Sequence, residues 1–298
     1  MMHHRILSFR QQPCGGDVRI APSIQPSHAL SSDPRLVLLI HGFNNDFYVA
    51  RESYCAFLEE QARLGPLTGA SIVEVYWPGD TGIRYWLSID RARRTADALA
   101  QQLRRAAENR SRQRGKLEVY VVAHSMGCRL TLELLRNLHF TPHASLRVKR
   151  VVFFAAAVPI IQLRLGAAPL RVFEEDGVEA LSLYSPEDFV LSDLFPKGQR
   201  MADFYNLDES GPPYVALGSA PLRAQPPLAR LRQFLAVKAG HSDYWCNRYR
   251  DVASRARNFI ALSVPDRTPD ERAPATRLSL ARKTATFVSR KLRPRVGC

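Results

Sequence analysis

The sequence predicts an α/β fold in which helices cover both faces of a mostly parallel central sheet. Two observations predict it. Short apolar runs of strand length alternate along the chain with longer segments of helical periodicity. Several of these runs are continuous stretches of Val, Ile and Leu, as in strands whose two faces are both covered. Strands and helices that alternate in this way are typical of βαβ units.

The first buried strand is predicted at "LVLLIHG" (36–42), which is too short for a buried helix and ends in glycine. The segment 47–64 follows it and places apolar residues such as Val49, Tyr54 and Phe57 at helical spacing, so we expect a helix there. The remaining predicted elements are, in chain order, a strand at 71–77, a helix at 88–108, a strand at 116–124, a helix at 126–138, and strands at 148–158, 178–185 and 231–240.

The chain of 298 residues divides into three segments by composition. Residues 1–33 are rich in Pro, Ser and Gly, and we expect an N-terminal extension that is mostly loop, with one short strand near "RILSF". The α/β domain is expected over 34–264. Residues 265–298 begin with a Pro-punctuated linker and continue as a basic tail, which we expect to be flexible.

The net charge of +14 is concentrated in this tail, because residues 272–298 hold eight Lys and Arg and no Asp or Glu. As a helix, the tail would carry a thin apolar stripe beside its cations, and such a helix would bind an anionic membrane surface. A solvated tail is the favoured interpretation. Nucleic-acid binding is disfavoured, since neither a recognised fold nor interleaved stacking aromatics accompany the charge.

The cysteines predict neither a disulfide framework nor a metal site. They are odd in number and widely scattered, without C-x-x-C spacing: Cys14, Cys55, Cys128, Cys246 and Cys298. The chain also shows no apolar core of a secretory signal and no apolar run near the ~18 residues of a membrane span. We therefore expect a reducing compartment and a cytoplasmic location.

The stretch "VVAHSMGC" (121–128) carries the main candidate for chemistry. Ser125 lies where a predicted strand passes into a predicted helix, which is the position of a nucleophile elbow. The strand and helix pass close together in such a turn, so small residues are needed two places before and after the serine, and here these are Ala123 and Gly127. The alternative interpretation is that Ser125 is only the N-cap of the helix.

A serine nucleophile needs a base, and the base needs an orienting acid. His241 is the candidate base, because it follows the last predicted strand, whereas His139 and His143 lie at the far end of the helix that starts at Ser125. The acid is expected directly after the preceding strand, in "LSLYSPEDF". We favour Asp188 there, with Glu187 as the alternate and Asp193 as a more distant choice. Together these residues predict a Ser, Asp and His catalytic triad.

The oxyanion of such a reaction needs two backbone N–H donors. Met126, directly after the serine, would supply one, and the loop "HGFNND" would supply the other through Phe43 or, alternatively, Asn44. His41 is expected to brace this loop.

The substrate pocket has its own candidates. Asn44, His124 and Trp77 are expected to line it, and the segment 192–229 is long enough to form a modest lid.

Five ordered motifs carry a resemblance to a known superfamily: "LVLLIHGFNNDFYVARE", "VEVYWPGD", "VYVVAHSMGCRLTLELL", "LYSPEDFVL" and "AGHSDYW". Together, over about residues 35–262, they resemble the α/β-hydrolase fold and a bacterial family of unknown function related to esterases and lipases. Two departures are Ala123, where the elbow usually has glycine, and "AAAVPI" (155–160), where relatives often carry an Asp.

The resemblance implies Ser125 as nucleophile, Asp188 as acid and His241 as base. It also implies hydrolysis of a small-molecule acyl ester without a metal or organic cofactor, although thioesters and amides use the same residues. The rival interpretation is a non-catalytic module that binds an anionic membrane or an acidic partner through its basic surface.

Overall fold

The computed structural model describes residues 4–25, 30, 33–64, 70–112, 115–163, 168–207, 211–222, 230–245 and 250–261. The chain separates into two compact units, Met1–Val264 and Pro265–Cys298. The second unit, and with it the expected basic tail, lies outside the described residues, which all belong to the first unit.

The core of the first unit is an eight-stranded sheet with the strand order β2-β1-β4-β3-β5-β6-β7-β8. β1 and β2 pair antiparallel, and the other neighbouring strands pair parallel, which confirms the predicted mostly parallel sheet. The strands are β1 (His4–Arg10), β2 (Val18–Gln25), β3 (Arg35–Ile40), β4 (Ser71–Tyr76), β5 (Leu117–His124), β6 (Leu146–Phe154), β7 (Glu179–Tyr184) and β8 (Leu231–Leu235).

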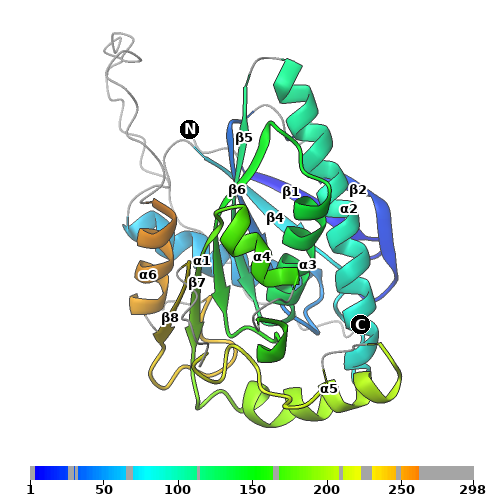
Figure 1. Ribbon diagram of the computed structural model, residues 1–298, viewed down its shortest axis with the longest axis vertical. Helices are drawn as coiled ribbons and strands as arrows, with labels where there is room; N and C mark the ends of the chain where they lie inside the picture. The colour runs from blue at the N-terminus through cyan, green and yellow to red at the C-terminus, as the bar shows by residue number, and fades with distance from the viewer. Residues whose placement is uncertain are drawn as a thin grey trace, which may run out of the picture. The chain divides into compact units, whose positions relative to one another are not determined.

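Helices cover both faces of the sheet, as expected (Figure 1). They are α1 (Phe47–Leu64), α2 (Tyr85–Arg112), α3 (Met126–Phe140), α4 (Ala168–Glu175), α5 (Phe195–Phe204) and α6 (Arg250–Ala261), with short helical turns η2 (Ile160–Leu163) and η3 (Val190–Leu194). No helix of the described part is both long and apolar enough to cross a bilayer.

Two hydrophobic cores lie on the two faces, and alternate residues of each strand divide between them. On β3, Leu36, Leu38 and Ile40 belong to the core that contains α2 and α3 residues, whereas Val37 and Leu39 belong to the core that contains α1 and α6 residues. This is why the strand reads as a continuous apolar run without polar positions.

The parallel register brings the carboxyl ends of the central strands to one edge of the sheet, at the bottom of Figure 1. Ile40 of β3 pairs with Ala123 of β5, and His124 at the end of β5 pairs with Phe154 at the end of β6. The loops that follow β3, β5, β7 and β8 therefore begin at the same edge. Ligands bind at this edge in open parallel sheets.

The N-terminal segment contains the short strand expected near "RILSF", which is β1, and a second strand, β2, where loop was expected. Of these, β1 pairs in parallel with β4 from His4↔Ile72 to Ser8↔Tyr76. Leu7 and Phe9 are fully buried in a core of the sheet. The composition of residues 1–33 did not reveal this, because Pro and Gly gather in the turn between the strands while the short run "RILSF" carries the buried side chains.

The segment after β7 also differs from its expected form. Part of the predicted lid, 192–229, is the helix α5, which packs against α2 through a T-shaped contact between Tyr85 and Phe195 with ring centroids 6.2 Å apart. A proline in its first turn and a glycine inside it hid this helix from its pattern. The helices α4 and α6 were likewise not predicted.

One cysteine departs from the expected absence of disulfides. Cys14 is disulfide-bonded. Cys55 is free and exposed, and Cys128 is free and buried, where burial raises the pKa of its thiol. Spacing in the sequence could not predict a bond that depends on which cysteines the fold brings together. Because disulfides persist mainly in oxidising compartments, this bond gives no support to the expected cytoplasmic location.

Candidate active site

Ser125 lies on the turn between β5 and α3. Its backbone has φ 53° and ψ −121°, a conformation that residues other than glycine rarely adopt. Backbone hydrogen bonds hold the turn: the Ser125 N–H donates to the Phe154 carbonyl at 2.9 Å, and the Ser125 carbonyl accepts from the Ala157 N–H at 3.1 Å. The hydroxyl forms no hydrogen bond with the N-terminal turn of α3, so the geometry does not match an N-cap.

Close packing around the turn explains its small residues. A Cβ atom on Gly127 would lie 2.5 Å from the His41 carbonyl oxygen and 2.7 Å from that of Ile40, so only glycine fits at this position. A Cβ on Gly42 would lie 2.9 Å from the Ser125 Cβ. Ala123 is fully buried between its partners on β3 and β6, where its single methyl fits. The departure at Ala123 therefore leaves the turn intact.

His241 brings the serine and the carboxylate together. Its Nδ1 lies 2.8 Å from Asp188 Oδ2, and its Nε2 lies 2.9 Å from Ser125 Oγ. Because an ionised carboxylate only accepts hydrogen bonds, the ring proton belongs on Nδ1, and Nε2 is left as an acceptor for the serine hydroxyl. Asp188 is fully buried, and its other oxygen accepts from the Leu191 N–H at 3.1 Å.

The other candidates considered for these roles lie elsewhere. Glu187 is exposed, and the Asp193 carboxylate pairs with Lys197 at 2.7 Å. His139, near the end of α3, contacts Asp176 at 3.0 Å, and His143 accepts from the Ser145 N–H at 3.2 Å. Of the residues considered for nucleophile, base and acid, the structure joins Ser125, His241 and Asp188 in one chain of hydrogen bonds.

The loop after β3 faces the serine turn. Met126 is the first residue of α3, and neither its N–H nor that of Phe43 donates to another described residue. Asn44 has φ 56°, and its N–H donates to the Gly79 carbonyl at 3.0 Å, which leaves Asn44 unavailable as an oxyanion donor. The geometry therefore favours Phe43 over Asn44.

His41 braces this loop, as expected. Its Nδ1 donates to the Gly42 carbonyl at 2.9 Å, and its Nε2 accepts from the Trp77 N–H at 3.2 Å. Burial and the charge of Arg10 hold the pKa of His41 well below its usual value, so the ring is neutral. A neutral imidazole with both ring nitrogens in hydrogen bonds is a structural group here and not a proton carrier.

His124 and Trp77 do not occupy the open positions expected of pocket residues. Trp77 is fully buried, and its indole N–H donates to the His41 carbonyl at 2.8 Å behind the loop. His124 is 5% exposed, and its Nε2–H donates to the His241 carbonyl at 2.7 Å. Both side chains are buried and donate hydrogen bonds to backbone carbonyls of residues 41 and 241, so they support the site rather than line a pocket. Asn44 is exposed.

The contact between His124 and His241 was not predicted from the sequence. The two rings lie 4.9 Å apart, and burial, followed by the charge of His241, lowers the pKa of His124 to about 3. His124 is therefore neutral, and it holds the backbone of the loop that carries His241. No pattern signals a contact between residues 117 positions apart.

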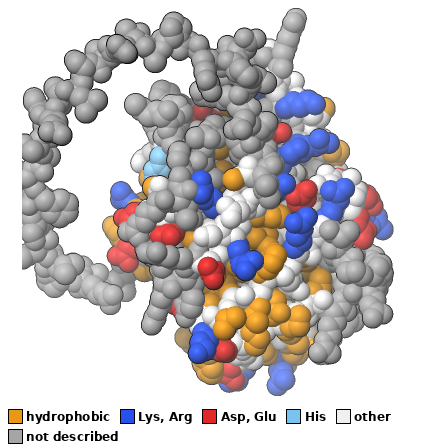
Figure 2. All heavy atoms as spheres, turned by 90° about the vertical axis from the view of Figure 1, so that its left-hand side faces the viewer, with side chains coloured by type: hydrophobic (Ala, Val, Ile, Leu, Met, Phe, Trp, Pro, Cys, Tyr) orange, Lys and Arg blue, Asp and Glu red, His pale blue; other side chains and the backbone are white. Residues whose placement is uncertain are grey.

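Exposed apolar side chains lie at or just after the carboxyl ends of the last two strands. They are Phe189, Phe234, Leu235 and Val237, which are between 38% and 64% exposed. Figure 2 shows hydrophobic side chains gathered toward the lower end of the molecule, where the carboxyl edge of the sheet lies in Figure 1. Within the described residues, no three His, Cys, Asp or Glu side chains gather as metal ligands would.

Comparison with known proteins agrees with this fold. Residues 24–169 match the model of the family described as "Alpha/beta hydrolase of unknown function (DUF900)". No curated protein matches the chain.

Two solved structures illustrate the likeness. An uncharacterized protein from Bacillus cereus ATCC 10987 is 15% identical over 78% of this chain, with a TM-score of 0.44, and this chain covers 62% of its length. An esterase from Pyrobaculum calidifontis is 13% identical over 81% of this chain and 80% of its own, with a TM-score of 0.42. No residue role follows from likenesses of this size. With the mostly parallel sheet, the turn at Ser125 and the family match over residues 24–169 in agreement, the chain has the α/β-hydrolase fold.

Proposed function

We propose that this protein is a serine hydrolase that cleaves carboxylic esters through an acyl-enzyme, with Ser125 as nucleophile, His241 as base and Asp188 as the acid that orients the base. The observation that supports this most is the pair of contacts made by His241, 2.9 Å to Ser125 Oγ and 2.8 Å to Asp188 Oδ2. A serine hydroxyl is a weak nucleophile until such a base removes its proton.

The first half of the reaction forms the acyl-enzyme. Ser125 Oγ attacks the carbonyl carbon of the ester while His241 Nε2 takes the hydroxyl proton, and Asp188 stabilises the imidazolium that forms. The N–H groups of Phe43 and Met126 donate to the oxyanion of the tetrahedral intermediate. His241 then gives its proton to the leaving alkoxide oxygen, the carbon–oxygen bond breaks, and an alcohol departs.

Water completes the cycle. His241 Nε2 removes a proton from the attacking water, a second tetrahedral intermediate forms in the same oxyanion site, and its collapse returns the proton to Ser125 Oγ. The carboxylic acid is released. Thioesters and amides follow the same steps with a different leaving atom, so a panel of substrates has to decide among them.

Intact mass after treatment with a fluorophosphonate tests the proposal. The wild type is expected to gain one adduct, the Ser125→Ala variant none, and the His241→Ala variant an adduct that forms far more slowly. His139→Ala is a matched control, because His139 also contacts an Asp carboxylate, at 3.0 Å, and lies far along α3 from Ser125. That variant is expected to react as fast as the wild type.

A folded wild type that forms no adduct would sink the hydrolase mechanism. It would leave the non-catalytic module as the interpretation to pursue. An adduct that persists in Ser125→Ala would place the reactive group elsewhere in the chain.

A further inference from the structure

The loop that carries Phe43 is held by segments from outside it. It connects β3 to α1, and Asn44 adopts the left-handed conformation within it. On one side, the Asn44 N–H donates to the Gly79 carbonyl at 3.0 Å; on the other, the Phe47 N–H donates to the Pro13 carbonyl at 3.1 Å. The position of the Phe43 N–H therefore depends on residues 13 and 79, which belong to two other loops.

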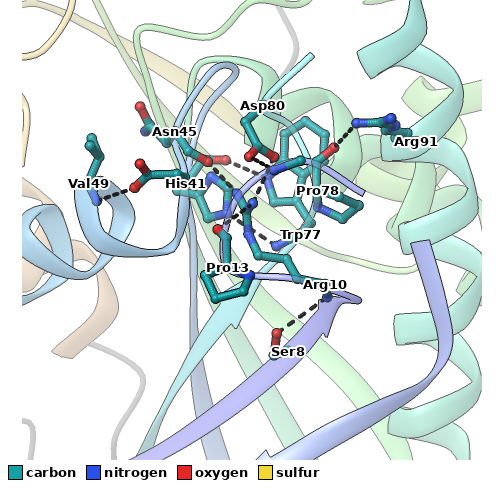
Figure 3. A network of polar contacts seen from close by, with 12 residues as sticks. Ser8, Arg10, Pro13, His41, Asn45, Val49, Trp77, Pro78, Asp80 and Arg91 are labelled. Atoms are coloured by element: carbon teal, nitrogen blue, oxygen red, sulfur yellow. Dashed lines mark hydrogen bonds and ion pairs between the residues drawn. The ribbon is translucent and has the colours of Figure 1, made fainter. Parts of the chain in front are cut away.

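Arg10, at the end of β1, joins these loops to one another (Figure 3). Its guanidinium donates to the carbonyl oxygens of Asn45 and Pro13, the latter at 3.3 Å, and pairs with Asp80 Oδ1 at 2.7 Å. The side chain is 1% exposed. A planar group with donors on several nitrogens holds three acceptors in a fixed arrangement, which a lysine ammonium, with all its donors on one nitrogen, does not reproduce.

Asp80 completes the arrangement. Its second carboxylate oxygen accepts a hydrogen bond from the Gly15 N–H, and its side chain is 12% exposed. One buried ion pair thus connects the N-terminal loop 13–15, the loop 44–46 and the loop 78–80. Burying two charges is costly, and an ion pair of this kind often adds little stability compared with apolar packing. An apolar pair in this place would not reproduce the hydrogen bonds that join the three loops.

We propose that Arg10, held by Asp80, is a positioning residue that fixes the loop 42–46 so that the Phe43 N–H meets the oxyanion. This inference rests on the proposed function. Arg10 does not touch the reacting atoms; it acts through the Asn45 carbonyl two residues from Phe43. Because Arg10 is paired with Asp80, we assign its effect on Phe43 to geometry rather than to a long-range field.

The substitution Arg10→Lys separates geometry from charge. Lysine keeps the cation beside Asp80 but has a single nitrogen, which does not span Asp80, Pro13 and Asn45 together. We expect kcat for an ester to fall by about 10- to 100-fold, as misplacement of a group by ~1 Å costs up to about 10²-fold. KM is expected to stay within about twofold, because the loop acts on the transition state and not on ground-state binding.

The chain supplies a matched control on the same strand. Arg5 is 4% exposed and pairs with Asp33 at 2.6 Å, at the amino end of β1 and away from the loop 42–46. Arg5→Lys imposes the same chemical change in a similar environment. It is expected to lower the melting temperature about as much as Arg10→Lys does and to leave kcat unchanged.

The experiment measures kcat, KM and melting temperature of the full chain and its variants on a p-nitrophenyl ester, together with the rate of fluorophosphonate adduct formation. A kcat that falls in Arg10→Lys and not in Arg5→Lys supports the inference. Equal kcat values in the wild type and Arg10→Lys, with the wild type forming its adduct, overturn the inference alone. A wild type without an adduct overturns the proposed function and this inference with it.

A second pair of variants covers the case in which Arg10→Lys does not fold. Asp80→Asn keeps the shape of the side chain and one acceptor oxygen, and Asp33→Asn is its control. A kcat lowered in Asp80→Asn relative to Asp33→Asn supports the inference, and equal values overturn it.

Discussion

At the scale of single residues, the turn at Ser125 combines an uncommon backbone conformation with very close packing. The φ of 53° is sterically costly for a side chain with a Cβ, and such conformations persist only where the surroundings hold them. Here the Phe154 carbonyl and the Ala157 N–H hold the backbone on both sides of the serine. The hydroxyl is presented toward His241 as a result.

Gly127→Ala is expected to lower both stability and reactivity. The new Cβ would lie 2.5 Å and 2.7 Å from two backbone carbonyl oxygens, which cannot rotate away as a side chain can. Relief requires α3 to move away from β3, and overpacking of this kind costs about 1–3 kcal/mol. Chemical denaturation measures the loss, and the rate of fluorophosphonate labelling is expected to fall because Ser125 and Met126 move with the helix.

Gly115→Ala serves as its control. The nearest atoms to a Cβ there, at 2.9 Å, belong to the flexible side chain of Arg110, which can shift. Stability within about 0.5 kcal/mol of the wild type is expected for this surface change. Equal losses of stability in both variants would mean that replacing any glycine with alanine, and not the contact with the carbonyls of residues 40 and 41, causes the loss.

The sequence predicted those parts of the site that depend on residue type and place along the chain. Ser125 follows from the strand-to-helix turn, and His241 and Asp188 follow from strand ends that meet at one edge of the sheet. The contacts of His124 with His241 and of Arg10 with Asn45 were not predicted, because they join residues 117 and 35 positions apart without a motif. Trp77 was expected to line the pocket but is buried, because its place at the end of a strand does not reveal whether the indole turns outward or inward.

At the scale of elements, the predicted strands and helices of the central sheet agree closely with the structure. The helix expected over 47–64 is α1, and the strand expected over 116–124 is β5. β5 is a nearly continuous apolar run, and α1 places Tyr54 and Phe57 at helical spacing. Other features hid two of the elements that were missed: β2 is largely exposed, and α5 contains a proline and a glycine. Their positions are fixed by packing against neighbours rather than by their own sequence.

The pairing of β1 with β4 includes a contact that depends on pH. His4 Nε2 lies 2.7 Å from Oε1 of the buried Glu74, and this hydrogen bond raises the pKa of His4 above 6.5. A group whose pKa is higher in the folded state stabilises the fold fully below its unfolded pKa, and this stabilisation is lost as the pH rises through the folded value. Opposing effects come from burial and from Arg51, which lower this pKa.

His4→Gln is expected to be less stable than the wild type at pH 5.5 and closer to it at pH 9. Glutamine keeps a donor for Glu74 but does not titrate. The His4 side chain is 48% exposed, so solvent screening limits the difference to about 1 kcal/mol or less. Urea denaturation across this pH range measures it, and a difference that stays constant with pH would contradict the assigned role of the His4 charge.

At the scale of the whole molecule, the N-terminal strands determine where the folding unit begins. The compact unit runs from Met1 to Val264, whereas composition placed its start at residue 34. A chain that begins at residue 34 would lose Leu7 and Phe9, which are fully buried, and would leave the edge of β4 unpaired. It would also lack Arg10, on which the loop 42–46 depends.

We therefore expect a chain truncated to 34–298 to lack a cooperative thermal transition and to aggregate. Burial of each large apolar side chain contributes about 1.5–3 kcal/mol, and the whole fold of a domain is stable by only about 5–15 kcal/mol. A chain truncated to 1–264 keeps every contact among the described residues and is the control. Because Cys14 is disulfide-bonded, both chains are compared in the presence of a reductant, where the control is expected to melt as the full chain does. Circular dichroism melts and size-exclusion chromatography distinguish the two. If 34–298 melted cooperatively at the temperature of the full chain, β1 and β2 would be an addition to the hydrolase fold rather than part of its core.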